Sequence, residues 1–123
     1  MQHAASAWQV FGTRKCAETR KALRYFKERS VRVQEIDLAQ RAMSPGELRK
    51  VAAQHGWLQL IDREGARFRD RGLAHARLTD PDIERLLLED PTLMRTPVVR
   101  RGPKSSVGYQ PEIWQGWLAA DKA

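Results

Sequence analysis

The sequence contains a single cysteine, Cys16, among its 123 residues. An internal disulfide needs two cysteines, so a disulfide scaffold is excluded, and the composition agrees with a reducing compartment. No apolar run approaches the length of a membrane-spanning helix, and residues 1–7 lack the basic start and the apolar stretch of a signal peptide. These absences predict a cytoplasmic protein without a membrane partner.

Motifs for metals and nucleotides are missing as well. The three histidines, His3, His55 and His75, are far apart and match no metal spacing, so no metal site is expected. No serine nucleophile elbow, P-loop or dinucleotide fingerprint is present, and no bound cofactor is expected. The net charge of +7 favours anionic partners, but the basic residues are scattered along the chain and no nucleic-acid-binding motif is found. Direct nucleic-acid binding is therefore not expected, and Cys16 is the obvious reactive group.

The surroundings of Cys16 favour a reactive thiol at the start of a helix. Residues 8–11 form an apolar, strand-like run, and a helix is expected from Cys16 to about Arg29. Free backbone N–H groups and the helix dipole favour an anion at such a position, and so the nucleophilic thiolate. Nearby positive charges come from Arg14, Lys15 and Arg20. The alternative is a small, buried and unreactive cysteine, which is common for unpaired cysteines.

Further candidates for a site lie elsewhere in the chain. Thr19 follows Cys16 by one helical turn, so its hydroxyl is either a donor to the thiolate or that of an ordinary first-turn residue. Arginines suited to binding oxyanions or carboxylates, or simply solvated, are Arg67, Arg69 and Arg95. Thr96-Pro97 precedes a β-favouring run and is a candidate for a cis-proline turn, although most X-Pro bonds are trans.

The rest of the first half predicts a βαβ unit followed by helices. Residues 31–38 alternate apolar and polar side chains, as in a half-buried strand. A helix is expected from Ser44 and Pro45 to about Gly56, with a capping box at its start. Another is expected to begin with Asp80 as its N-cap. Residues 58–71 show no regular period.

The last third predicts a hairpin and a terminal helix. The β-favouring run at 98–101 is expected to pair with a second strand at 107–109. A helix is expected to open at Pro111. Its predicted core-facing residues are Ile113, Trp114, Trp117 and Leu118.

These motifs, in this order, resemble the arsenate reductase-like family, which contains ArsC, the regulator Spx and the YffB-type proteins. The motifs are Cys16-x-x-Thr19 after a strand, Gly65-x-x-Phe68-Arg69, and the run from Arg95 to Val99, and the resemblance extends from Trp8 to Leu118. It implies an α/β, thioredoxin-like fold. One domain would cover residues 1–123, with a helical insertion at about 40–92 between the N-terminal βαβ unit and the C-terminal β-hairpin and helix.

The resemblance also implies roles for individual residues. Cys16 is the expected nucleophile, with Thr19 and Arg95 completing the catalytic set. The residues implied in binding substrate or glutathione are Arg69, Arg67, Thr96, Pro97 and Tyr109, with Pro97 as the cis-proline that faces the cysteine.

Three departures narrow the expected function. Arsenate reductases of this class carry a histidine at the position that Gly12 occupies in this chain, and a third arginine at the position of Tyr109. Spx-type regulators carry a second cysteine at the position of Thr19. The closest resemblance is therefore to the YffB-type branch, which implies a glutathione-dependent thiol oxidoreductase. Because no second cysteine exists, an external thiol such as glutathione or a glutaredoxin must resolve the intermediate. The substrate would be a thiol or an anionic small molecule. A divergent arsenate reductase and a non-catalytic, Spx-like protein with a protein partner remain alternatives.

Overall fold

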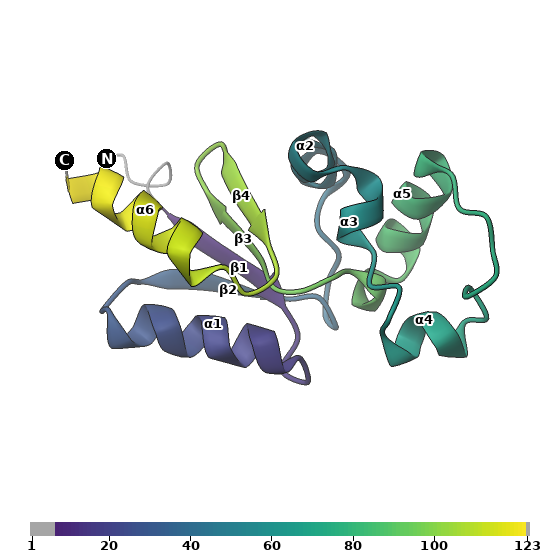
Figure 1. Cartoon of the computed structure of the whole chain (residues 1–123), viewed down its shortest axis with the longest axis horizontal. Helices are drawn as coiled ribbons and strands as arrows, with labels where there is room; N and C mark the ends of the chain where they lie inside the picture. The colour runs from purple at the N-terminus through teal and green to yellow at the C-terminus, as the bar shows by residue number, and fades with distance from the viewer. Residues whose placement is uncertain (1–6, 123) are drawn as a thin grey trace. The chain divides into compact units, whose positions relative to one another are not determined.

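Two stretches that are distant in sequence combine into the unit that carries Cys16. The structure is a computed structural model that describes residues 7–122, so His3 and the segment before residue 7 lie outside the described part. The first unit comprises the described parts of 1–36 and 96–123, and the second is Asp37–Arg95. The elements of the first unit (Figure 1) are β1 (Trp8–Gly12), α1 (Ala17–Glu28), β2 (Val33–Asp37), β3 (Val98–Arg101), β4 (Lys104–Val107) and α6 (Pro111–Lys122).

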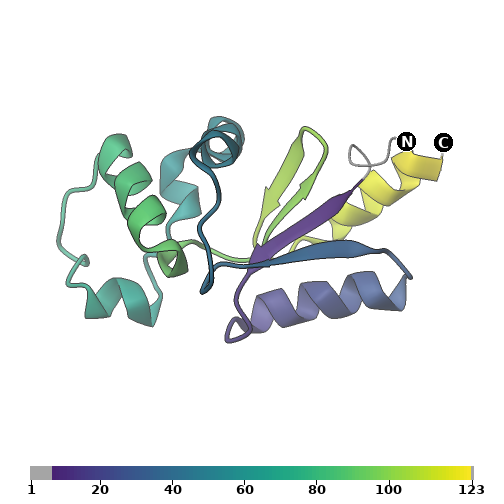
Figure 2. The same cartoon turned by 180° about the vertical axis from the view of Figure 1, so that it is seen from behind.

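A four-stranded mixed sheet forms the centre of the first unit, with the strand order β2-β1-β3-β4. β3 runs antiparallel to both of its neighbours, and Val98 lies opposite Phe11 on one side and Val107 on the other. Helices α1 and α6 lie on the same face of the sheet (Figures 1 and 2). This is the thioredoxin-like α/β fold that the family resemblance implied.

The hairpin differs from the prediction in its second strand. The sequence placed that strand at 107–109, whereas β4 is Lys104–Val107. Arg101 pairs with Lys104, so Gly102 and Pro103 alone make the turn. Gly102 adopts a φ of 60°, which a tight two-residue hairpin turn requires and glycine supplies without strain. The polar sequence of β4 concealed the strand, because its two serines are buried rather than exposed.

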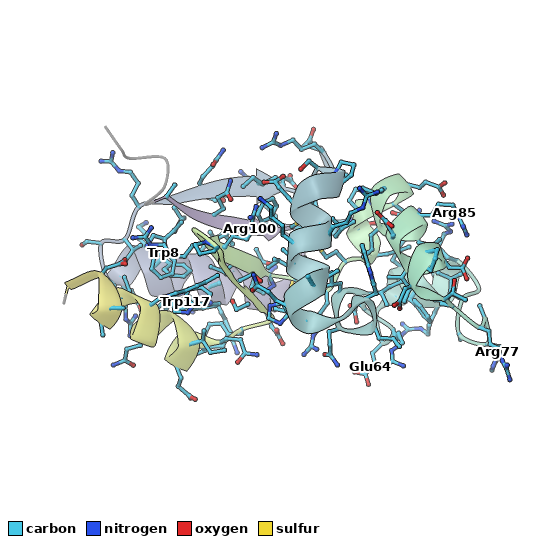
Figure 3. All side chains as sticks on the ribbon, turned by 90° about the horizontal axis from the view of Figure 1, so that it is seen from above. Trp8, Glu64, Arg77, Arg85, Arg100 and Trp117 are labelled. Carbon is cyan, nitrogen blue, oxygen red and sulfur yellow. The ribbon has the colours of Figure 1, made fainter. Side chains whose placement is uncertain are left out.

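Aromatic side chains fill the space between the sheet and the two helices. Phe26 and Trp114 are fully buried, with ring centroids 5.0 Å apart. Trp8 and Trp117 lie side by side at the other end of this cluster, 5.8 Å apart (Figure 3). Ile113 was predicted to face the core, but it is 42% exposed, because it lies at the edge of the face that Trp114 occupies. α1 is thus fixed to the sheet by its buried residues, and Cys16 directly precedes it.

The second unit is helical. Its elements are α2 (Pro45–His55), α3 (Trp57–Leu60), α4 (Ala66–Asp70), α5 (Asp80–Glu89) and the 3₁₀ helix η2 (Pro91–Leu93). The predicted capping box of α2 is confirmed, because Ser44 and Glu47 bond to each other's backbone N–H groups. The predicted N-cap of α5 is wrong by one position. Thr79 is the N-cap, since its hydroxyl accepts from the Asp82 N–H and the Asp82 carboxylate accepts from the Thr79 N–H.

The stretch without a period, residues 58–71, contains most of α3 and all of α4, which are too short to produce a recognisable helical repeat. Within residues 7–122, no helix is long and apolar enough to cross a membrane.

Candidate functional site

Cys16 is the N-cap residue of α1. Its backbone is extended, with φ −80° and ψ 117°, and its carbonyl accepts the Arg20 N–H at 3.1 Å. The Cys16 N–H donates to the Thr13 carbonyl at 3.2 Å, which closes a turn between β1 and the helix. The half-buried sulfur therefore lies at the helix N-terminus, where backbone N–H groups lack helical partners.

A second segment of the first unit, Thr96-Pro97, contacts the Cys16 sulfur. The Cys16 thiol donates to the Thr96 carbonyl, with 3.6 Å between Sγ and the oxygen. The Thr96–Pro97 peptide bond is cis, which confirms the cis-proline that the family resemblance implied. Pro97 is buried, and its carbonyl accepts the Gly108 N–H at 2.8 Å. The loop after β4 thereby holds the cis-proline turn beside Cys16.

These neighbours change the acidity of the thiol. Burial raises the pKa of Cys16, but hydrogen bonds from the side chains of Thr19 and Thr96 and from the backbone at Thr19 and Glu18 lower it. The net result is a pKa below the ordinary value of cysteine. A hydrogen bond to the charged form stabilises that form, so the site favours the nucleophilic thiolate.

Thr19 is placed to act on this thiolate. Its side chain is 4% exposed, and its hydroxyl has no partner among the described residues other than the sulfur that it can reach. A buried hydroxyl without a partner costs free energy, and an ionised sulfur is an acceptor that would satisfy it. Of the two interpretations that the sequence left open for Thr19, the geometry favours the donor.

Gly12 makes room for Thr19. A Cβ at position 12 would lie 2.5 Å from both Oγ1 and Cγ2 of Thr19 and 3.0 Å from its Cβ. Thr19 is β-branched and carries an atom on each side, so it cannot rotate out of contact. The presence of glycine where the resemblance leads one to expect histidine thus has a local cause.

Glu18 was missed by sequence reasoning. Its carboxylate accepts the backbone N–H of Tyr109 at 3.2 Å, which ties the first turn of α1 to the segment after β4. The Tyr109 ring packs edge-on against Trp114 at 5.5 Å, and the Lys21 ammonium lies 5.7 Å from its centroid. Because an acidic residue in the first turn of a helix is common, nothing in the local sequence pointed to this contact.

Arg67 lies in the second unit, bound to an acidic partner. Both Arg67 and Arg71 donate to the same oxygen of Asp90, at 2.8 and 2.7 Å, and the Thr92 hydroxyl donates to the other at 2.8 Å. Burial raises the pKa of Asp90, but the hydrogen bonds from Thr92, Arg71 and Arg67 outweigh it, and the pKa lies below the ordinary value. These bonds give Arg67 a stabilising role in the second unit, and its predicted role in binding glutathione stays a prediction.

Arg69 and Arg95 also belong to the second unit and are exposed. Arg69 donates to the Glu64 carbonyl at 3.0 Å, and Arg95 to the Gln59 side chain at 3.5 Å. Neither guanidinium has an ion pair within residues 7–122, so both charges are free to bind an anion. Their predicted roles stay predictions. In the same part of the chain, no three His, Cys, Asp or Glu residues are grouped as ligands for a metal.

Comparisons with known proteins cover most of the chain. The sequence profile described as "ArsC family" matches residues 11–117. A solved structure of a YffB protein is 26% identical, with a TM-score of 0.81, over 89% of this chain and 97% of that one. An arsenate reductase structure from Vibrio cholerae is 19% identical, with a TM-score of 0.76, over 90% and 97%. The global transcriptional regulator Spx 2 of Bacillus anthracis is 22% identical over 105 residues, which cover 84% of this chain and 80% of the regulator.

Proposed function

The chain belongs to the ArsC family, and from that premise we propose that it is a glutathione-dependent thiol oxidoreductase with Cys16 as the nucleophile. The observation that carries the proposal is the environment of the sulfur. Cys16 lies half-buried at the N-terminus of α1, and hydrogen bonds hold its pKa below the ordinary value. The family includes arsenate reductases, and a nucleophilic thiolate is what thiol chemistry in such a site requires.

The proposed reaction consists of two exchange steps. The Cys16 thiolate attacks one sulfur of a disulfide substrate, a mixed disulfide forms, and the other substrate sulfur leaves as a thiolate. Glutathione, as thiolate, then attacks the mixed disulfide and releases Cys16. Each step breaks one S–S bond and forms one, so the electrons come from glutathione alone. Since Cys16 is the only cysteine, the second sulfur must be external. A reaction that depends on reduced glutathione supports a reducing compartment such as the cytoplasm as its proposed location.

Three neighbours have defined parts in this scheme. The Thr19 hydroxyl donates to the sulfur when it is ionised and when Cys16 is the leaving group. The Thr96 carbonyl, which accepts from the thiol, becomes available to an N–H of the incoming substrate once the proton is lost. Pro97 holds this carbonyl beside the sulfur, because the Gly108 N–H fixes the turn.

The site also contains a reason to prefer this reaction over arsenate reduction. The expected histidine is replaced by Gly12, and a side chain at that position would collide with Thr19. Reduction of arsenate would need this chain to supply the missing groups by other residues. Arg69, Arg95 and Tyr109 are proposed to bind the carboxylates of glutathione, and this part of the proposal rests on the family resemblance.

A regulatory, protein-binding role is the second candidate. The similarity to the regulator Spx 2 favours it. Thr19 stands where Spx-type regulators carry a second cysteine, so an internal disulfide switch is not available to this chain. In this alternative, the function would persist without the thiol.

The decisive variant is Cys16→Ser, which keeps the size of the side chain and removes its nucleophilicity. The assay follows NADPH oxidation through glutathione reductase, with glutathione and 2-hydroxyethyl disulfide as substrates. The wild type should consume NADPH above the uncatalysed rate, and the variant should not. Equal rates would overturn the proposal. Arsenate supplied in place of the disulfide should give no rate above background.

A further inference from the structure

Positive charge is distributed unevenly between the two units. Of the 22 Lys and Arg residues, 10 lie in the second unit, together with 10 of the 15 Asp and Glu residues, so that unit is neutral. The remaining 12 cations and 5 acids give the first unit the entire net charge of +7. The net positive charge is therefore confined to the unit that carries Cys16, although cations occur in both units.

Within the first unit, three exposed cations form a row along one helix. Arg20, Arg24 and Lys27 are exposed and recur at intervals of four and three residues, so they share one face of α1. One step of four backward from Arg20 leads to Cys16 at the N-cap. The row from Cys16 to Lys27 is about 16 Å long. We call the row of Arg20, Arg24 and Lys27 the basic face of α1. Further exposed cations nearby in the sequence are Arg14 and Lys15, which precede the helix, and Lys21.

These cations lack acidic partners within the described part of the first unit. Glu28 contacts Arg29, and Glu18 accepts the Tyr109 N–H. Arg20 donates to a neutral acceptor, the Arg14 carbonyl, at 2.6 Å, which leaves its charge uncompensated. Like charges one helical turn apart, such as Arg20 and Arg24, destabilise a helix. An uncompensated row of this kind is suited to an external anionic surface.

We propose that the basic face of α1 is the docking surface for an acidic protein that brings a reducing thiol to Cys16. The inference rests on the proposed function. The row runs toward the helix N-terminus, where Cys16 is the N-cap, so its partner must present carboxylates along the helix and a thiol near that end. A protein can present both, whereas a nucleic acid carries negative charge but no thiol. Complementary charge of this kind raises the rate of association and selects the partner.

The chemistry at the end of the row balances without another reagent. Where the disulfide substrate contains glutathione, the first exchange step can leave Cys16 in a disulfide with glutathione. The partner's thiolate, in place of free glutathione, attacks the glutathione sulfur of this disulfide, and Cys16 leaves as the thiolate that the site stabilises. One S–S bond breaks and one forms, between the partner and glutathione. Cys16 is thereby reduced, and the partner's thiol is oxidised.

Three synthetic peptides of equal length can test the docking surface. Each carries one cysteine and a run of Glu, Gln or Lys, and each reacts with the full chain after Cys16 is converted to its mixed disulfide with thionitrobenzoate. Release of the coloured thionitrobenzoate measures the rate at which each peptide thiol attacks the mixed disulfide. This rate is divided by the rate of the same peptide with 2-hydroxyethyl disulfide, which corrects for differences in intrinsic thiol reactivity between the peptides. The wild type should react about tenfold faster with the Glu peptide than with the Gln peptide at low salt, and the advantage should vanish at high salt.

Charge reversal locates the effect on the helix. In the double variant Arg24→Glu and Lys27→Glu, the advantage of the Glu peptide over the Gln peptide should fall well below that of the wild type. The matched control, Arg41→Glu and Arg77→Glu, makes the same change in net charge on exposed residues of the second unit, and it should keep the preference for the Glu peptide. An equal loss of preference in both variants would mean that net charge alone acts, and would overturn the docking surface.

The outcomes separate this inference from the proposed function. Equal rates with all three peptides would leave a reactive Cys16 and overturn the docking surface. A thiol that forms no mixed disulfide would overturn both. Binding of a duplex oligonucleotide that the α1 variant abolishes, without any preference among the peptides, would assign the face to nucleic acid and contradict the proposal.

Discussion

Gly12 and Thr19 approach each other so closely that a Cβ on Gly12 would lie 2.5 Å from the Thr19 hydroxyl oxygen. Gly12, the last residue of β1, thus leaves the space in which the Thr19 hydroxyl lies near the Cys16 sulfur. Because Thr19 is buried and its hydroxyl has no other partner among the described residues, the pair links the strand directly to the chemistry of the thiol.

Gly12→Ala should displace Thr19 and impair the thiol. Overpacking of a filled core costs about 1–3 kcal/mol, so the free energy of unfolding should fall by that amount. The pKa of Cys16 should rise, because the Thr19 hydroxyl moves away from the sulfur. Urea denaturation and the pH dependence of alkylation by iodoacetamide measure the two effects. The control is Gly116→Ala, where the added methyl meets nothing within 4 Å and should stabilise α6 by up to about 1 kcal/mol. Unchanged alkylation in Gly12→Ala would contradict the link.

Thr19→Val should distinguish the hydrogen bond of the Thr19 hydroxyl from the packing of the Thr19 side chain. Valine fills nearly the same volume but cannot donate, so the pKa of Cys16 should rise and the alkylation profile should shift to higher pH. The free energy of unfolding should change by less than about 1 kcal/mol, since the hydroxyl that is lost has no protein partner in the protonated state. Thr19→Ser should restore the profile. An unshifted profile in the valine variant would show that Thr19 only packs.

Asp90 should make stability depend on pH. The folded-state pKa of Asp90 is lowered, so its contribution is complete above the unfolded value of about 3.9 and disappears as the pH falls through the lower folded value. Asp90→Asn should cost about 1–2 kcal/mol at neutral pH, because Arg67 and Arg71 are partly exposed and can be solvated. The loss should shrink below about pH 3.9. Urea denaturation of both proteins at several pH values tests this, and a difference that is independent of pH would refute it.

Local signals in the sequence predicted the fold well where one residue decides the conformation. The capping box at Ser44 is an example, whereas the cis bond at Pro97 was implied by the family resemblance and not by the local sequence. β4 was misplaced because its serines are buried, and Ser106 accepts the Trp114 indole N–H at 2.8 Å, a contact that α6 supplies and that no local pattern reports.

The site was predictable around Cys16 and less so elsewhere. Helical spacing predicts that Thr19 lies one turn from Cys16. The close approach of Gly12 to Thr19 could not be predicted, because it arises from the packing of α1 on β1. The pairing of Arg67 with Asp90 joins residues 23 positions apart, and that of Glu18 with Tyr109 spans 91. Such contacts exist only in the folded chain. The basic face of α1 likewise emerges only once the helix places Arg20, Arg24 and Lys27 in one row.

The central claim is that this site stabilises a thiolate, and titration of the Cys16 thiolate by its ultraviolet absorbance tests it most directly. The measurement is unambiguous, because the chain has no other cysteine and Cys16→Ser supplies the blank. We predict a single transition with a midpoint below that of cysteine in an unstructured peptide titrated under the same conditions. A midpoint at or above that value would contradict it.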